Sequence, residues 1–149
     1  MISKILIPTD GTPASKKAID YAIGLAKQTK ASITILGVVD KSAFLAQSIP
    51  ASITSNEIIT PIEDYLNKLT ESHVDQAVKQ CRKKRVKPVT VIRSGHPVEE
   101  IVKEARRSKS NLIVVGSHGK GALESAVLGS VTYGLIQNNT KYPVLVIRG

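Results

Sequence analysis

Short apolar runs alternate with amphipathic stretches along the whole chain. The runs are rich in Ile, Val and Leu, as in strands that are covered on both faces. They occupy residues 4–8, 32–39, 89–92, 111–115 and 144–147. The stretches between them have the spacing of amphipathic helices. This alternation predicts an α/β fold, an open parallel sheet of five strands joined by right-handed crossovers.

Two of the helices are predicted from apolar spacing and from capping residues. The first runs from residue 13 to about residue 30, with Thr12 as its N-cap and Pro13 in its first turn. The second is expected to begin at the capping-box sequence TPIE, residues 60–63. Its apolar face comprises Ile62, Leu66, Leu69, His73, Ala77 and Cys81.

Two further helices are expected at residues 97–107 and 129–138. The first of these has glutamates in its first turn and arginines in its last, which is the polarity that the helix dipole favours. Residues 40–59 show no clear period, and so long a connection is typical of a lid or a disordered segment. No repeat or linker divides the chain, so we predict a single domain over residues 1–149.

The composition is that of an ordinary globular protein, with 42% hydrophobic and 22% charged residues. No apolar run approaches the roughly 18 residues of a membrane span, and the first run is too short for a secretory signal. The single cysteine, Cys81, excludes an internal disulfide and suits a reducing compartment. We therefore expect a cytoplasmic protein with no membrane contact.

The formal net charge of +9 would attract polyanions such as nucleic acid, an anionic membrane or a nucleotide. The chain has no Trp, one Phe and four Tyr, whereas single-strand binding usually needs aromatic platforms for the bases. Many of the basic residues are also expected at helix ends, where they complement the helix dipole. We therefore interpret them as solvated surface, including the run at residues 82–85, and nucleic acid as an unlikely partner.

The sequence VVGSHGKGALESAVLGSV, residues 114–131, contains four glycines, of which Gly116, Gly119 and Gly129 form the pattern Gly-x2-Gly-x9-Gly with Ser130 next. It is not a P-loop, which requires Lys and Ser or Thr where this chain has Ala122 and Leu123. It is not the dinucleotide fingerprint either, because Glu124 stands where the third glycine belongs. Both familiar phosphate-binding motifs are therefore excluded.

The same stretch nevertheless has the chemistry of a phosphate site. Gly116 and Gly119 would let backbone N–H groups approach an anion and would permit positive φ angles. Gly129 and Ser130 stand where a helix should begin, and a helix N-terminus attracts phosphate. The alternative is that the glycines serve only turns and that Ser130 is an N-cap. The spacing alone does not separate these two interpretations.

Two segments of the chain resemble the universal stress protein family. NLIVVGSHGKGALESAVLGSVTYGLIQNNTKYPVLVIR is similar to the C-terminal half of that family, and KILIPTDGTPASKKAIDYAIGLAKQTKASITILGVVD to its opening strand, helix and strand. Members that carry Gly-x2-Gly-x9-Gly-Ser/Thr tend to bind ATP, and here the motif is complete. The resemblance implies a Rossmann-like fold of the adenine-nucleotide alpha-hydrolase type. Its sheet order is 3-2-1-4-5, with helices on both faces.

The resemblance also implies roles for individual residues in ATP binding. Asp10 would lie near the ribose and phosphates, the backbone of Val38 would read the adenine edge, and that of Val131 would help hold phosphate. The implied ATP-binding residues are Pro8, Thr9, Asp10, Val38, Gly116, Ser117, His118, Gly119, Gly129, Ser130 and Val131. Family members usually dimerise through the last strand, and apolar residues 144–146 fit such an edge.

Isolated reactive residues add little catalytic chemistry. We interpret His118 as a phosphate contact or exposed loop residue, His73 as packing and His96 as a helix cap. Asp10 has an alternative as a plain turn residue before Gly11. The three histidines share no metal-ligand spacing, so any Mg²⁺ or Mn²⁺ would be held mainly by the nucleotide phosphates. We assign no catalytic residue and no protein metal site.

The sequence leads to one main hypothesis and two alternatives. The main hypothesis is an ATP-binding, stress-responsive sensing module with little or no hydrolysis, because the chain shows no P-loop lysine and no clustered metal carboxylates. The alternatives are a slow nucleotide hydrolase of the same superfamily and a nucleotide-free dimeric adaptor.

Overall fold

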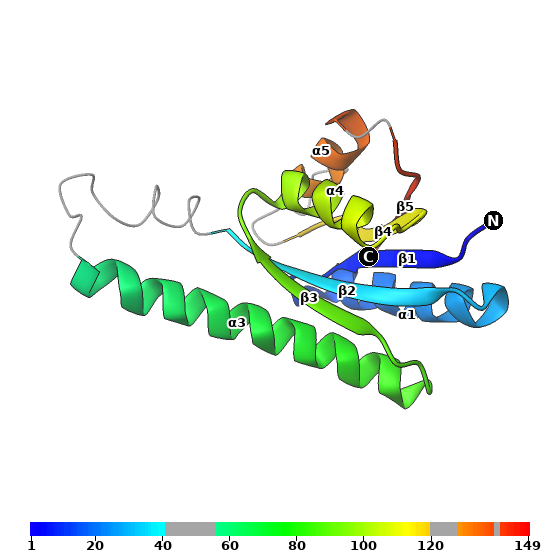
Figure 1. The fold of residues 1–149 in the computed structure, drawn as a ribbon, viewed down its shortest axis with the longest axis horizontal. Coiled ribbons are helices and arrows are strands. Elements are labelled where there is room, and N and C mark those ends of the chain that lie inside the picture. Colours follow the sequence, from blue (N-terminus) through cyan, green and yellow to red (C-terminus); the bar gives the residue numbers. More distant parts are fainter. Residues whose placement is uncertain (41–55, 120–127, 139–140) are drawn as a thin grey trace.

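The computed structural model describes residues 1–40, 56–119, 128–138 and 141–149. Its elements follow the predicted alternation of strands and helices (Figure 1). The strands are β1 (Lys4–Pro8), β2 (Ser32–Val39), β3 (Val89–Ser94), β4 (Leu112–Gly116) and β5 (Val144–Ile147). The helices are α1 (Pro13–Thr29), α3 (Asn56–Lys83), α4 (Pro97–Arg107) and α5 (Ser130–Asn138).

The five strands form one parallel sheet in the order β3-β2-β1-β4-β5, as the resemblance implied. Ile5 is paired with Ile33 of β2 and with Leu112 of β4, so β1 is central. From β1 the chain winds outward to β2 and β3, and then returns to build β4 and β5 on the other side. The winding therefore reverses between β1 and β4, and such a reversal is where ligands bind in open α/β sheets.

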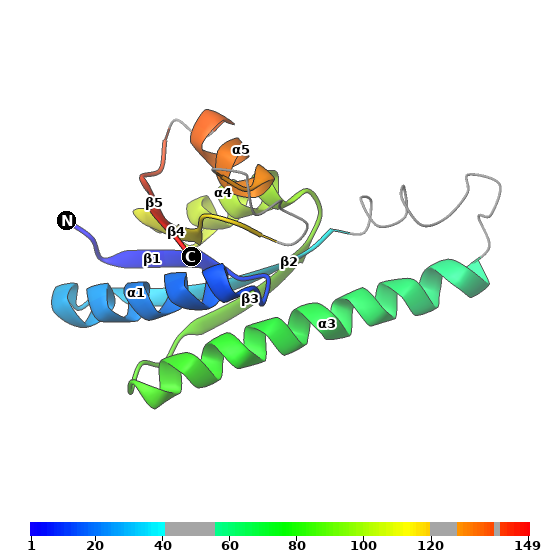
Figure 2. The same cartoon turned by 180° about the vertical axis from the view of Figure 1, so that it is seen from behind.

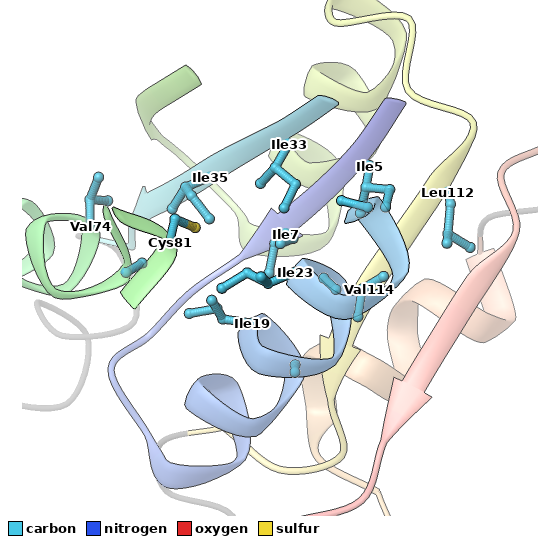
Figure 3. Packing of buried hydrophobic residues seen from close by; sticks show 14 residues of the cluster. Ile5, Ile7, Ile19, Ile23, Ile33, Ile35, Val74, Cys81, Leu112 and Val114 are labelled. Atoms are coloured by element: carbon cyan, nitrogen blue, oxygen red, sulfur yellow. The ribbon is translucent and has the colours of Figure 1, made fainter. Parts of the chain in front are cut away.

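Helices cover both faces of the sheet, α1 and α3 on one and α4 and α5 on the other (Figures 1 and 2). Because side chains alternate along a strand, Ile5 and Ile7 of β1 point to one face and Leu6 to the other. The first face packs on Ile19 of α1 and Val74 of α3, with the buried Cys81 beside them (Figure 3). The second face packs mainly on α4 and α5.

Local capping explains where α1 begins and ends. The Thr12 hydroxyl accepts a hydrogen bond from the backbone N–H of Ser15 at 3.2 Å, and Pro13 occupies the first turn. Lys30 adopts the left-handed conformation, with a φ angle of 60°, and ends the helix. His96 is in the N-cap position of α4 as predicted, but its side chain makes no capping hydrogen bond.

One predicted boundary was wrong. Helix α3 begins at Asn56, so residues 56–59 are helical and the capping-box sequence at 60–63 does not start the helix. Pro61 lies inside α3, in its second turn. Proline has no N–H to donate, so the hydrogen bond from residue 61 to the carbonyl four residues earlier is missing from this turn. The rest of the connection that was expected to be a lid or a disordered segment, residues 41–55, lies outside the described residues.

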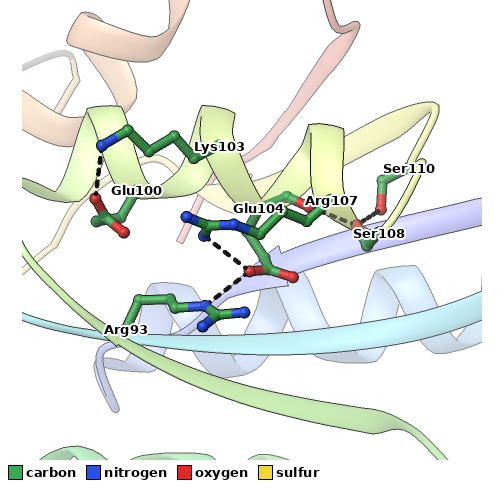
Figure 4. Close-up of polar contacts among 7 residues, drawn as sticks. All are labelled: Arg93, Glu100, Lys103, Glu104, Arg107, Ser108 and Ser110. Carbon is green, nitrogen blue, oxygen red and sulfur yellow. Dashed lines mark hydrogen bonds and ion pairs between the residues drawn. The ribbon is translucent and has the colours of Figure 1, made fainter.

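Helix α4 is fastened over β3 by a buried carboxylate. Glu104, 3% exposed, accepts a hydrogen bond from Nε of Arg93 at 3.0 Å and lies 3.4 Å from Nη1 of Arg107 (Figure 4). Glu100, one turn earlier, pairs with Lys103 at 3.4 Å. These contacts join α4 to a strand at the sheet edge that packs few of its own side chains.

No helix among the described residues is long and apolar enough to cross a membrane.

Candidate functional site

A cavity of about 130 Å³ opens at the carboxyl ends of β1 and β4, where the winding of the sheet reverses. Eight of the eleven residues implied by the resemblance line it: Pro8, Thr9, Asp10, Val38, Gly116, His118, Gly119 and Val131. We call this cavity the switch-point cleft. The other three, Ser117, Gly129 and Ser130, belong to segments that border the cleft without lining it.

The end of β1 is held rigidly beneath the cleft. The Thr9 backbone N–H donates to the Leu36 carbonyl at 2.9 Å, and its buried hydroxyl lies 2.8 Å from that of Ser15. Oδ1 of Asp10 accepts from the Thr12 backbone N–H at 3.1 Å and from its hydroxyl at 2.6 Å. Asp10 is therefore a turn residue, as its simpler interpretation held, and it is also a carboxylate at the cleft.

The second carboxylate oxygen of Asp10 approaches the glycine stretch. A Cβ added to Gly119 would be 2.8 Å from Oδ2 of Asp10, which is closer than real Cβ contacts come. The absence of a side chain at Gly119 therefore lets the ends of β1 and β4 approach one another across the cleft.

Gly116 serves a different purpose. A Cβ there would be 2.7 Å from the carbonyl carbon and 2.8 Å from the carbonyl oxygen of Ala14 in α1. The space beside Gly116 is thus filled by the helix backbone, and this glycine lets α1 pack closely on β4. The motif glycines permit positive φ angles but do not adopt them, because positive φ among the described glycines occurs only at Gly11 and Gly95.

Gly129 brings the start of α5 against the loop that follows β4. A Cβ at Gly129 would be 3.1 Å from the backbone N of Gly119 and 3.2 Å from Cα of His118. The Gly129 backbone N–H donates to the Ser117 carbonyl at 2.6 Å, which fixes the approach. The loop and the helix N-terminus are therefore one rigid border of the cleft.

Ser117 is buried next to this border and holds it through hydrogen bonds. It is 1% exposed, and its backbone N–H donates to the Ile147 carbonyl at 2.9 Å. Its hydroxyl accepts from the Gly149 backbone N–H at 3.3 Å and lies 3.0 Å from Nδ1 of His118. Ser117 thus connects the end of β5 to the loop, and the half-buried His118 is the neighbour that reaches the cleft.

The first turn of α5 presents free backbone donors. Its Tyr133 N–H already donates to the Gly129 carbonyl at 2.9 Å, and the Thr132 hydroxyl donates to the Gly116 carbonyl at 2.7 Å. Within the described part of the chain, the N–H groups of Ser130 and Val131 have no acceptor. Ser130 is exposed and Val131 lines the cleft, so this helix start offers donors and partial positive charge to an anion there.

The apolar part of the cleft was missed by sequence reasoning. It is lined by Leu36 of β2, Val115 of β4 and, one turn apart in α4, Pro97 and Ile101. In the sequence these residues follow the same apolar periodicity as core residues, so the sequence alone does not distinguish a cleft position from a core position. Together with Val38 they form a slot whose walls suit a flat, apolar-faced group.

Other candidate residues lie outside the switch-point cleft. His73 is half-buried against the backbone of Gly11 and lines a second cavity of about 140 Å³, with Leu69 and Thr70 of α3. Cys81 is fully buried in the core, and burial together with the nearby Asp20 raises the pKa of its thiol to about 11. The inert thiol that the sequence predicts is consistent with this environment.

Comparisons with known proteins agree with this architecture. The family model for the universal stress protein family matches residues 1–148. Universal stress protein YxiE of Bacillus subtilis is 33% identical over 149 residues, covering 99% of this chain and all of the relative. Universal stress protein MJ0531 of Methanocaldococcus jannaschii is 36% identical over 148 residues, covering 99% of this chain and 83% of the relative.

Solved structures share the fold. That of MJ0577 from Methanocaldococcus jannaschii superposes with a TM-score of 0.82 at 28% identity, over 100% of this chain and 97% of that one. Universal stress proteins solved with cAMP and with dAMP, the latter from Archaeoglobus fulgidus, have TM-scores of 0.69 and 0.63. The structure with cAMP is 22% identical, and the match covers 98% of this chain and 97% of that one. The structure with dAMP is 17% identical, and the match covers 99% of this chain and 98% of that one. By its sequence and its fold, this chain belongs to the universal stress protein family.

Proposed function

We propose that this protein binds ATP in the switch-point cleft and acts as a nucleotide-sensing module of the stress response, with little or no hydrolysis. The observation that carries the proposal is the position of the α5 N-terminus. Its free N–H groups at Ser130 and Val131 border the same cleft that the apolar slot enters. A nucleotide has one apolar ring and one anionic tail, and the cleft offers a matching environment for each.

The adenine ring would occupy the apolar slot. Val38 and Leu36 of β2 and Pro97 and Ile101 of α4 line this part of the cleft. Ring burial against such side chains is favourable, since apolar surface is removed from water. Backbone groups at the end of β2 would then read the polar edge of the ring.

The ribose and phosphates would lie between Asp10 and the start of α5. Asp10 is the only carboxylate among the described residues that line the cleft, and its Oδ2 faces Gly119. A carboxylate of this kind suits ribose hydroxyls, and the helix N-terminus suits phosphate. Mg²⁺ or Mn²⁺ carried by the phosphates would neutralise part of their charge, and Asp10 would be the nearest protein carboxylate to such an ion.

The residues that line the cleft predict that ATP hydrolysis is slow at best. Among the described lining residues there is no Lys or Arg to stabilise charge on a transferring phosphoryl group. His118 is the one titratable group there besides Asp10. Universal stress proteins of the same fold have been solved with cAMP and dAMP, which supports an adenine nucleotide as the ligand class. The preference for ATP rests on the glycine motif and the α5 N-terminus.

The direct test is to denature the purified protein and identify the nucleotide it releases, followed by calorimetry with ATP, AMP, cAMP and GTP. We expect a released adenine nucleotide and tighter binding of ATP than of AMP or GTP. A chain that releases nothing and shows no heat with any nucleotide would instead be the dimeric adaptor. Multiple turnover that disappears on Asp10→Asn would identify a hydrolase.

A further inference from the structure

The turn that follows α3 is strongly basic. Arg82 and Lys83 end the helix, and Lys84, Arg85 and Lys87 follow before β3 begins. All five side chains are exposed. In the sequence this run looks like a single solvated helix end, and its partners become visible only in the fold.

Other basic residues join the run at the same edge of the sheet. Helices antiparallel to the strands end where the strands start, so the ends of α1 and α3 lie with the N-terminus on one side of the molecule (Figure 1). This edge adds six exposed cations: Lys4, Lys27, Lys30, Arg106, Arg107 and Lys109. We call these six and the five after α3 the basic face; it lies opposite the switch-point cleft.

The basic face has little compensating negative charge. Asp20 of α1 lies beside it, where its Oδ1 accepts a hydrogen bond from Nε2 of Gln80 in the last turn of α3 at 2.7 Å. Within the described residues, Glu104 is the only carboxylate in the last turns of α1, α3 and α4 or in the turns that follow. It is buried and already engaged by Arg93 and Arg107. In the same part of the chain, the other cations of the face form no ion pair. This face therefore carries a large excess of positive charge.

Helix dipoles explain only part of this charge. Cations within a last turn, such as Lys27, Lys83 and Arg107, complement the dipole of their helix. The dipole effect falls off beyond that turn, yet Lys30, Lys84, Arg85, Lys87 and Lys109 all follow helix ends and Lys4 begins β1. Several like charges held on one face repel one another, so an external anion would be stabilised there.

We propose that the basic face binds the phosphate backbone of duplex nucleic acid without reading its bases. A duplex carries one charge per about 1.7 Å of its length, so a face of eleven exposed cations would meet many closely spaced phosphates. Arg82, Arg85, Arg106 and Arg107 can each engage phosphate through two donors.

The absence of stacking residues decides which nucleic acid fits. Among the residues that the structure describes, the exposed aromatic side chains are Tyr21, Tyr65 and Tyr133, which lie within helices and not in the turns of the basic face. Single strands would need such platforms, whereas contact with duplex phosphates does not. Nucleic acid was expected to be an unlikely partner for two reasons, the missing platforms and the placement of the basic residues at helix ends. The first reason does not apply to duplexes, and helix dipoles account for only part of the charge. An anionic membrane is disfavoured, because the only exposed large apolar residues near the face are Met1 and Val89 among those that the structure describes.

The test is fluorescence anisotropy with a labelled 20-base-pair DNA duplex, at salt concentrations from about 50 to 200 mM. We expect affinity to fall steeply with salt. The variant Lys83→Gln/Lys84→Gln should reduce the slope of log affinity against log salt by about 1.8, which is about 0.9 for each phosphate that the variant leaves unneutralised. Its affinity at the lowest salt should fall about tenfold or more.

The control is Lys68→Gln/Lys103→Gln, which removes the same charge from two exposed lysines inside α3 and α4, outside the basic face. We expect its salt slope to equal that of the unaltered protein. Circular dichroism and ATP calorimetry should show both variants folded and unchanged at the switch-point cleft.

Several outcomes would overturn the proposal. An equal weakening in both variants would mean that only net charge matters. Failure of the duplex to bind at about 50 mM salt would exclude the site. Equal affinity for polyglutamate would make an acidic protein the partner, and binding to phosphatidylserine vesicles without duplex binding would make it a membrane.

Discussion

Gly129 lies so close to Gly119 that a Cβ on the first would be 3.1 Å from the backbone N of the second. The hydrogen bond from Gly129 N–H to the Ser117 carbonyl keeps them together. Two glycines ten positions apart thus join the loop after β4 to the start of α5. Any side chain at residue 129 must displace one of these two borders of the cleft.

We therefore predict that Gly129→Ala weakens ATP binding at least tenfold and adenosine binding much less. Displacing the loop or the helix start would cost one or two charge-assisted hydrogen bonds to phosphate, each worth about 1.5–3 kcal/mol. Adenosine has no phosphates to lose. Calorimetry with both ligands measures the difference.

The control for that variant is Gly24→Ala, in the exposed middle of α1, where a Cβ would meet nothing within 4 Å. It should leave ATP affinity unchanged and increase stability by about 0.5–1 kcal/mol, because alanine favours helix over glycine. If Gly129→Ala weakens both ligands equally, or neither, the phosphates do not lie at this border.

Gly116→Ala should act through stability. The added Cβ would meet the backbone of Ala14 at 2.7 Å, and a helix backbone has little room to yield. Overpacking of this kind costs about 1–3 kcal/mol. Urea denaturation should show that loss. A variant as stable as the original protein would mean that α1 shifts easily away from β4.

Cys81 should make stability fall at high pH. Burial, with Asp20 beside it, raises the pKa of the folded thiol to about 11 from the ordinary value of 9.0. Between these values the unfolded thiol ionises while the folded one stays protonated, so its contribution is complete below pH 9 and is lost as pH rises through 11.

The measurement is chemical denaturation of the original protein and Cys81→Ala at several pH values from 8 to about 11. The stability advantage of the original protein should shrink by about 1–3 kcal/mol across this window. Iodoacetamide should also label the folded protein slowly at pH 8 and the unfolded protein rapidly. A constant advantage, with rapid labelling of the folded state, would show an accessible thiol.

Glu104→Gln should loosen α4 from the sheet edge. The substitution removes the charge that Arg93 and Arg107 share, at 3.0 and 3.4 Å. Both arginines are partly exposed and regain water, so we expect a moderate loss of about 1–2 kcal/mol by urea denaturation. Glu99→Gln, an exposed position in the same helix, should change stability by less than about 0.5 kcal/mol. Equal effects at the two positions would show that the buried ion pair contributes little.

We also predict a homodimer through β5. This edge strand is apolar and only half-buried along all four residues, and its outer backbone edge has no partner strand in the described sheet. Light scattering at micromolar concentration should give twice the 16.0 kDa chain mass. Val144→Lys should yield a folded monomer, whereas Val89→Lys on the opposite edge, β3, should remain a dimer. A 16.0 kDa particle for the original protein would reject the prediction.

The sequence by itself determined the elements, because each depends on neighbours along the chain. Apolar runs marked the five strands, and Thr12 and Pro13 marked the start of α1. The start of α3 was misplaced because a capping-box pattern can also occur inside a helix that begins earlier. The sheet order came from the family resemblance.

Only the tertiary structure decided what these residues do to one another. The approach of Asp10 to Gly119, the packing of Gly116 on Ala14 and the burial of Ser117 all join elements far apart in sequence. Pairing register and crossover direction fix such distances, and local periodicity carries no information about either. The same is true of the basic face, since parallel topology brings the ends of α1, α3 and α4 to one edge.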